Sequence, residues 1–219
     1  MVLGWRMTWL KMVACTLLLV TGGAVSDADA QNANGQKKRM VILGDSITAG
    51  YGLDPDEAYP SLLQKKIGDA QLPYTVINAG VSGDTSSGGL RRIDWVLGQK
   101  GADVLLIALG GNDGLRGVSP NETEKNLSGI IDKARAKSPQ IKIVLIGMEM
   151  PPNMGAEFTA SFKAIFPKVA TAKNVQFVPF LLQGVGGDLK LNQPDRIHPT
   201  AAGQKIIADH LWKDLEKQL

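Results

Sequence analysis

The feature that most restricts the fold is a fivefold alternation of short apolar runs with stretches compatible with helix. Each run has four to six residues, is rich in β-branched side chains and ends before Gly, Asn or Pro. The runs are residues 40–43, 74–77, 104–109, 141–146 and 175–178, and the stretches between and after them are 57–68, 85–98, 121–137, 157–172 and 200–218. Strands and helices in alternation predict an α/β domain with a parallel sheet and helices on both of its faces.

The stretch expected over 121–137 carries its own signal for where a helix begins. Ser119 offers an N-cap side chain, Pro120 suits the first helical position, and Glu122 lies in the first turn. We therefore expect this helix to begin directly after a capping serine.

The first thirty residues have the pattern of a signal peptide. Arg6 and Lys11 supply positive charge, residues 12–25 are largely apolar, and residues 28–30 have the small-x-small form of a cleavage site. We expect residues 1–30 to be a cleaved signal peptide, residues 31–38 a flexible polar leader, and residues 39–219 a single domain. A periplasmic or secreted location follows from that expectation.

Two other interpretations of the N-terminus fit less well. A membrane anchor needs about 20 apolar residues, and this stretch is interrupted at residues 21–23 by Thr-Gly-Gly. A lipoprotein cysteine at Cys15 would leave almost no apolar run before the cut. We therefore expect no stable membrane span in the mature protein.

Composition and charge exclude several classes of function. The formal charge is +3, from 24 Lys and Arg against 21 Asp and Glu, and the basic residues do not cluster with aromatic ones, so no nucleic-acid partner is expected. One cysteine and two histidines, His198 and His210, make a disulfide framework or a Cys/His zinc site improbable. No Walker loop, GxGxxG or HExxH occurs, so we expect no nucleotide or metal cofactor.

Polar residues follow the strands at the positions where a parallel sheet binds its ligands. Ser46 comes just after the first apolar run, and Asp195 and His198 lie just before the last helix. A serine hydroxyl needs an adjacent general base to act as a nucleophile, and an imidazole needs a carboxylate to hold its tautomer. The sequence therefore predicts a Ser46, His198 and Asp195 triad beyond the carboxyl ends of the strands.

Three groups are placed to stabilise an oxyanion. The backbone N–H of Ser46 lies at the start of a helix, Gly83 follows the second apolar run, and Asn112 follows the third. Gly83 can present its N–H without a side chain in the way of the substrate, and Asn112 can donate from its carboxamide. These groups are the predicted oxyanion hole.

These segments resemble the SGNH-type members of the GDSL hydrolase superfamily. The four blocks occur in order as Gly44-Asp45-Ser46, Gly83, Gly110-Gly111-Asn112-Asp113 and Asp195-Arg196-Ile197-His198, with Ile47 where the family name has Leu. The longer strings are similar to the exported bacterial acyl-CoA thioesterase, lysophospholipase and arylesterase group. The resemblance implies a flavodoxin-like, three-layer αβα fold with a five-stranded parallel sheet. It also implies Ser46 as nucleophile, Asp195 and His198 as its partners, and Gly83 and Asn112 in the oxyanion hole.

The expected activity is hydrolysis of small-molecule carboxylic esters, thioesters or lysophospholipids through an acyl-enzyme. One alternative is a carbohydrate or peptidoglycan O-acetylesterase, and an alternative of another class is a non-catalytic envelope binding or scaffold protein. The acyl chain is expected to bind near Met150, Met154 and Phe158, because they belong to a Met- and Pro-rich segment after the fourth run. The alternative for that segment is a packed connecting loop. The sequence does not give the oligomeric state.

The candidate site residues also have purely structural interpretations. Ser46 could be a helix cap, and Gly83 could be required only for the conformation of its turn. Asn112 and Asp113 could cap the turn that follows them. His210 is expected to be structural. The neighbouring carboxylates, Asp45 and Asp84, are expected to accept backbone hydrogen bonds rather than to orient His198.

Overall fold

The computed structural model describes residue 1 and residues 36–219. The expected signal peptide, including Cys15 and the proposed cleavage site after Ala30, therefore lies outside the described residues, as does most of the expected leader. The first strand begins at Lys38, whose backbone N–H donates to Pro73 O at 2.7 Å. The last residue of the expected leader thus belongs to the folded domain.

Five parallel strands form one sheet in the order β2-β1-β3-β4-β5, which is the flavodoxin-like order. The strands are β1 (Lys38–Gly44), β2 (Tyr74–Gly80), β3 (Val104–Ala108), β4 (Lys142–Ile146) and β5 (Gln176–Val178). Every residue of β3 is buried, because helices cover both faces of a parallel sheet and leave no solvated side. The predicted α/β class and all five predicted strands are confirmed.

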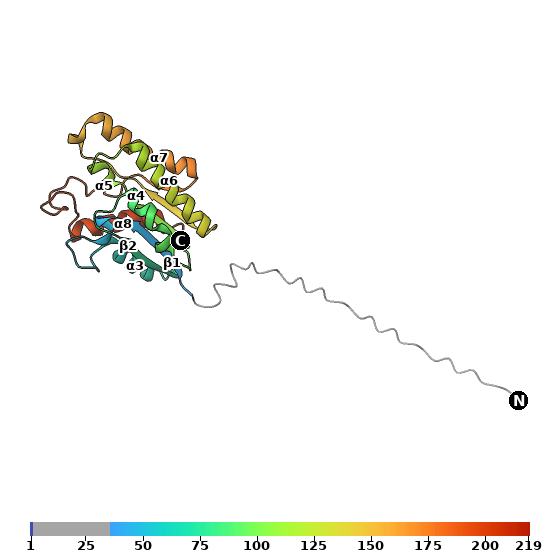
Figure 1. Ribbon diagram of the computed structural model, residues 1–219. Coiled ribbons are helices and arrows are strands. Elements are labelled where there is room, and N and C mark those ends of the chain that lie inside the picture. The colour runs from blue at the N-terminus through green and yellow to red at the C-terminus, as the bar shows by residue number, and fades with distance from the viewer. Residues whose placement is uncertain (2–35) are drawn as a thin grey trace. The chain divides into compact units, whose positions relative to one another are not determined.

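Long helices cover the two faces of the sheet (Figure 1). They are α3 (Tyr59–Asp69), α4 (Ser86–Leu97), α6 (Pro120–Lys137), α7 (Ala156–Lys173) and α8 (Ala201–Leu215). Helices α4, α6 and α7 pack side by side on one face, and α3 packs against α8 on the other. All five predicted helices are present, with ends that differ by three residues or fewer from those expected.

The register of the sheet determines which loops meet. Gly44, the last residue of β1, pairs with Gly80 at the end of β2 and with Ala108 at the end of β3. Three strands therefore end level with one another. Three short helical elements follow strands at this edge, namely α2 (Ser46–Ala49), α5 (Gly111–Leu115) and the 3₁₀ turn η1 (Pro152–Met154).

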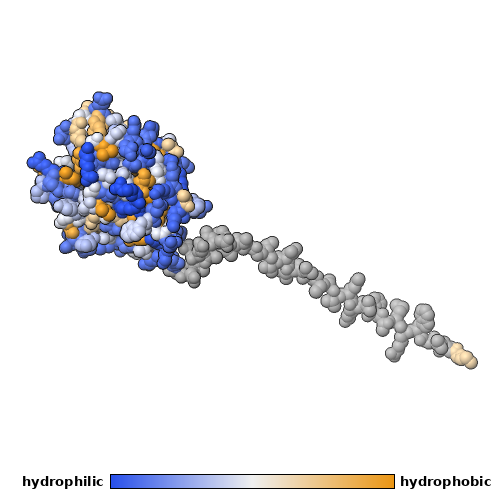
Figure 2. All heavy atoms as spheres, viewed as in Figure 1, coloured by the Kyte–Doolittle hydropathy of each residue, from blue (hydrophilic) through white to orange (hydrophobic). Residues whose placement is uncertain are grey.

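The surface of the domain carries few large apolar groups. On the face shown in Figure 2, hydrophilic residues cover most of the area and apolar residues occur in small separate patches. None of the helices among the described residues combines the length and the apolar character needed to cross a membrane.

Candidate active site

Ser46 lies at the sharp turn from β1 into α2. The Asp45 carboxylate caps this helix by accepting from Ile47 N–H at 3.0 Å, and Gly50 ends it in the left-handed region with φ 76°. A Cβ at Gly80 would lie 2.4 Å from Ala49 N, so the end of β2 must be glycine for α2 to pack there. The alternative in which Ser46 caps the helix does not describe the structure, because the capping side chain belongs to Asp45.

The structure brings Ser46, His198 and Asp195 into one hydrogen-bonded line. His198 Nε2 lies 2.8 Å from Ser46 Oγ, and His198 Nδ1 lies 2.6 Å from Asp195 Oδ2. The other carboxylate oxygen of Asp195 accepts from the backbone N–H groups of Ile197 and His198 at 2.9 and 3.0 Å. A single tight turn thus fixes the carboxylate against the imidazole, with Arg196 at φ 61° inside it.

These hydrogen bonds determine the ionisation of Asp195. Partial burial acts to raise the pKa of its carboxyl, but hydrogen bonds from the His198 N–H, the His198 ring and the Ile197 N–H outweigh burial and lower the pKa to about 2. The carboxylate is therefore ionised at neutral pH, as it must be to hold Nδ1–H and to stabilise an imidazolium.

The Asn112 side chain reaches back from α5 toward the serine turn. Its Nδ2 donates to Asp84 O at 2.9 Å and, over a longer 3.3 Å, to Asp45 Oδ2. The amide therefore does not cap the turn that follows it. One N–H is held by a backbone carbonyl, and the other points toward the segment that carries Ser46.

Gly83 lies between β2 and α4 with φ 78°, a conformation that favours glycine. Its carbonyl accepts from Arg116 Nη2 at 3.0 Å, so the residue that follows α5 contacts this loop as well. A third contact comes from Asp113, whose buried carboxylate accepts from the Ser86 N–H at 2.8 Å and from the Ser86 hydroxyl. The Asp113 side chain therefore joins α5 to the start of α4. The sequence does not indicate these hydrogen bonds of Asp113 and Arg116.

The two neighbouring carboxylates differ in their surroundings. Asp84 accepts from Thr85 N–H, as expected, and also forms an ion pair with Arg92 at 2.7 Å, while Arg92 donates to Gly44 O. Asp45 accepts from a backbone N–H, as expected, but no cation is paired with it within the described residues. Burial raises the pKa of Asp45 to about 6.

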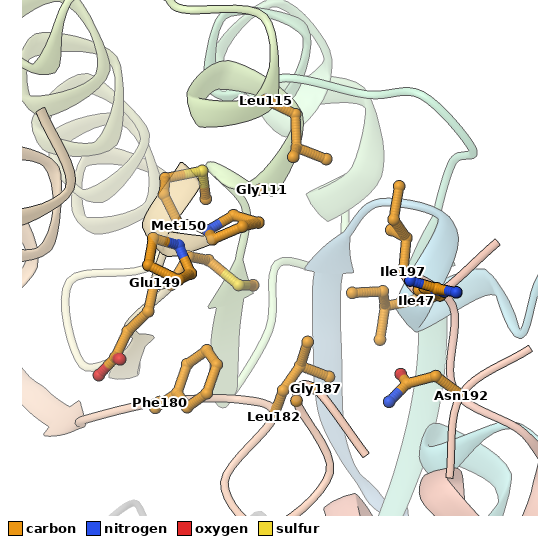
Figure 3. A pocket seen from close by; sticks show the side chains of 15 residues that line it. Ile47, Gly111, Leu115, Glu149, Met150, Phe180, Leu182, Gly187, Asn192 and Ile197 are labelled. Carbon is orange, nitrogen blue, oxygen red and sulfur yellow. The ribbon is translucent and has the colours of Figure 1, made fainter. Parts of the chain in front are cut away.

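A cavity of about 360 Å³ is lined in part by the residue that follows Ser46 and the residue that precedes His198 (Figure 3). Ile47 and Ile197, the sequence neighbours of Ser46 and His198, lie on one side of it, and Met150 and Phe180 lie on the other. The remaining residues of its lining are mostly apolar, including Leu115, Met148, Pro151, Pro152 and Leu182.

Of the three residues expected around an acyl chain, only Met150 lines this cavity. Met154 lies in η1 and is not part of the lining, and Phe158 packs on the hydrophobic core beside Phe162, with 5.7 Å between ring centroids. Two lining residues that the sequence analysis missed, Phe180 and Leu182, follow β5 directly. Their position after a strand was the available signal.

The described part of the chain holds no cluster of three or more His, Cys, Asp or Glu side chains suited to a metal ion. His210, expected to be structural, lies in α8, and its Nε2 is buried without a hydrogen-bond partner. It lies on a different element from the triad and takes no part in it.

The geometry agrees with the comparison with known families. Residues 42–206 match the model of the GDSL-like Lipase/Acylhydrolase family. The chain belongs to this family. Relatives include the esterase TesA of Pseudomonas aeruginosa strain PAO1, 40% identical over 82% of this chain and 89% of its own length, and the thioesterase 1/protease 1/lysophospholipase L1 of Escherichia coli K12, 38% identical over 81% and 83%.

Solved structures of the family share the fold. The crystal structure of TesA superposes with a TM-score of 0.80 at 40% identity, covering 83% of this chain and all of that one. The psychrotrophic esterase EstA from Pseudoalteromonas, inhibited by monoethylphosphonate, gives a TM-score of 0.78 at 34% identity and covers 83% of this chain and 98% of its own. The predicted SGNH-type fold is therefore confirmed.

Proposed function

We propose that the protein is a serine hydrolase that cleaves carboxylic esters and thioesters through an acyl-enzyme. The observation that carries this proposal is the line from Ser46 Oγ to His198 Nε2 at 2.8 Å and from His198 Nδ1 to Asp195 Oδ2 at 2.6 Å. This is the geometry of an activated nucleophile with a general base whose tautomer is fixed. Membership of the family supports the same activity.

In the proposed reaction, His198 Nε2 takes the Ser46 proton while Ser46 Oγ bonds to the acyl carbon. The oxyanion accepts hydrogen bonds from the N–H groups of Ser46 and Gly83 and from the Asn112 amide. His198 then gives the proton to the departing alcohol or thiol. Water, deprotonated by His198, attacks the acyl carbon in the second half, and the acid leaves as Ser46 recovers its proton.

The Asn112 amide has one hydrogen available for this role. Its 2.9 Å bond to Asp84 O holds the side chain in place, and its 3.3 Å bond to Asp45 is long enough to be exchanged for an oxyanion. Donors fixed before the reaction lower its barrier because they need no reorganisation when charge develops.

The cavity favours substrates whose acyl chain is longer than acetyl. Its apolar lining and volume of about 360 Å³ suit a hydrocarbon chain, whereas an O-acetylesterase needs no such space beside its serine. The names of the relatives, esterase TesA and thioesterase 1/protease 1/lysophospholipase L1, support ester and thioester substrates. The cavity and the complete triad likewise favour an enzyme over a non-catalytic binding or scaffold protein.

The proposal includes export. The pattern of residues 1–30 supports a cleaved signal peptide and a periplasmic or secreted location, with the catalytic domain following the leader.

The activity test compares Ser46→Ala with the wild-type protein on chromogenic esters of acetyl to decanoyl chain length and on a matching thioester. We expect wild-type hydrolysis that favours chains longer than acetyl and essentially no turnover by Ser46→Ala. Ser161→Ala, an exposed serine on α7, is the matched control and should retain full activity. Wild-type turnover by Ser46→Ala would overturn the proposal, and activity confined to acetyl esters would favour the O-acetylesterase.

A further inference from the structure

We propose that Gln193 is a positioning residue that ties the histidine loop to the serine turn through Tyr51. The inference rests on the proposed function, because it concerns the alignment of His198 with Ser46. The histidine loop comprises residues 193–199, and the serine turn comprises residues 46–51.

Gln193 begins the histidine loop and is hydrogen-bonded to the residues at its other end. Its backbone N–H donates to His198 O at 2.7 Å, and its side-chain Nε2 donates to Pro199 O at 3.1 Å. Its own carbonyl accepts from Arg196 N–H at 2.8 Å. The loop therefore closes on Gln193.

The same side chain is bonded to the serine turn. Nε2 also donates to Tyr51 O at 2.7 Å, and Tyr51 N–H donates to Ser46 O at 3.0 Å. A primary amide has two N–H groups, so one serves each segment. Residues 142 positions apart in the chain are thus joined through a single amide.

Tyr51 adds a contact between rings. Its ring centroid lies 4.5 Å from that of His198, with the planes tilted by 39°. Displacement of the Tyr51 backbone would therefore also move a surface against which the imidazole packs.

The contacts of Asp195 cannot replace this connection. Asp195 bonds only within the loop that carries His198, so it orients the ring but moves together with it. Gln204 makes a second connection at the base of the loop, since its Nε2 in α8 donates to Ile47 O at 3.0 Å. We therefore expect loss of the Gln193 amide to misalign the triad and not to abolish it.

Gly52 supports the same role for Gln193. A Cβ at this position would lie 2.6 Å from Gln193 Oε1, and the residue has φ 77°. The glycine thus allows the Gln193 side chain to lie against the serine turn, and Gly52→Ala provides an independent way to displace it.

The test measures kcat and KM for a short-chain chromogenic ester in Gln193→Leu and in the isosteric Gln193→Glu, which keeps the volume but lacks the N–H donors. We expect kcat to fall about tenfold or more in both, because small misplacements at a reaction centre are costly, while KM changes less than twofold. The rate of labelling by a fluorophosphonate should fall in parallel.

Gln64→Leu is the matched control. The Gln64 amide likewise bonds two backbone groups, accepting from Val76 N–H at 2.7 Å and donating to Tyr74 O at 3.3 Å, but it does so near the start of β2, away from the site. The Gln64→Leu substitution should lower the melting temperature of the protein and leave kcat unchanged. If Gln193→Leu does not fold, Gly52→Ala should show the same loss of kcat.

Three outcomes would overturn the proposal. Unchanged kcat in the folded Gln193 variants, or an equal loss in Gln64→Leu, would show that the amide does not position the triad. A rise in KM with unchanged kcat would show that Gln193 acts on substrate binding instead. In each case an inactive Ser46→Ala would leave the proposed function standing, so failure of one proposal is distinguished from failure of the other.

Discussion

Asp45 precedes Ser46 in the chain and Asp195 is a member of the triad, and the pKa values of these two carboxyls are shifted in opposite directions. Asp195 is partly exposed and accepts three hydrogen bonds, which lower its pKa to about 2 despite partial burial. Asp45 is buried, so loss of hydration raises its pKa to about 6. The sequence indicates both carboxylates, but the sign of each shift depends on burial and on N–H donors that only the fold supplies.

The raised pKa of Asp45 predicts a particular pH dependence of stability. Because its pKa is about 6 in the folded protein against an ordinary 3.8, the folded state binds the proton more tightly than the unfolded state between these values. The contribution of Asp45 to the free energy of unfolding therefore decreases as pH rises from about 4 to about 6. Above that range it stays constant.

Asp45→Asn should remove this dependence. The free energy of unfolding of Asp45→Asn, measured with urea and taken relative to wild type, should increase as pH rises from about 4 to about 6 and then stay constant. Asp56→Asn controls for the loss of one negative charge at an exposed position. A stability difference between Asp45→Asn and wild type that is the same at every pH would show that the pKa of Asp45 is not raised by folding.

At the scale of elements, the short turns after the strands position the site. The α5 turn contacts the loop before α4 through Asn112, Asp113 and Arg116, and so links two of the proposed oxyanion donors. The alternation of helical stretches with apolar runs predicts each long helix to within three residues at either end. Ser119 differs from expectation in one respect, because α6 begins after it with Pro120 at the first position but the serine side chain makes no capping hydrogen bond.

In the segment after β4, the residues expected around an acyl chain lie in different surroundings. Met150 precedes η1 and faces the cavity, whereas Phe158 lies within α7, whose apolar face is directed toward the core. Composition alone could not separate the two, because Met and Phe suit a core as well as a binding site.

Met150→Ala should enlarge the cavity and shift preference toward longer acyl chains. We expect the ratio of kcat/KM for decanoyl over butyryl esters to rise by about threefold or more, given about 0.8 kcal/mol per buried methylene. Met154→Ala, a methionine in η1 outside the lining, is the matched control. An unchanged ratio in Met150→Ala, or the same change in both variants, would refute this assignment of the cavity.

For the molecule as a whole, the order of motifs along the chain and the rules of parallel sheets suffice to predict the fold and to place Ser46, Asn112 and His198 at one edge. For Ser46 and Asn112 the physical reason is that β1 and β3 end level with each other, and for His198 it is that the segment after β5 starts from the same edge of a parallel sheet. The connection through Gln193 and Tyr51 could not be predicted in this way. Neither residue has a distinctive pattern, and they meet only because the loop before α8 folds over the serine turn.

If Ser46 is the nucleophile of a preformed triad, it should react with a fluorophosphonate. Treating the folded protein with this reagent and mapping the adduct by mass spectrometry should give one adduct per chain, on Ser46, and none in Ser46→Ala. Absence of an adduct on the folded wild-type protein, or an adduct on another residue, would contradict the assignment of Ser46 as the nucleophile.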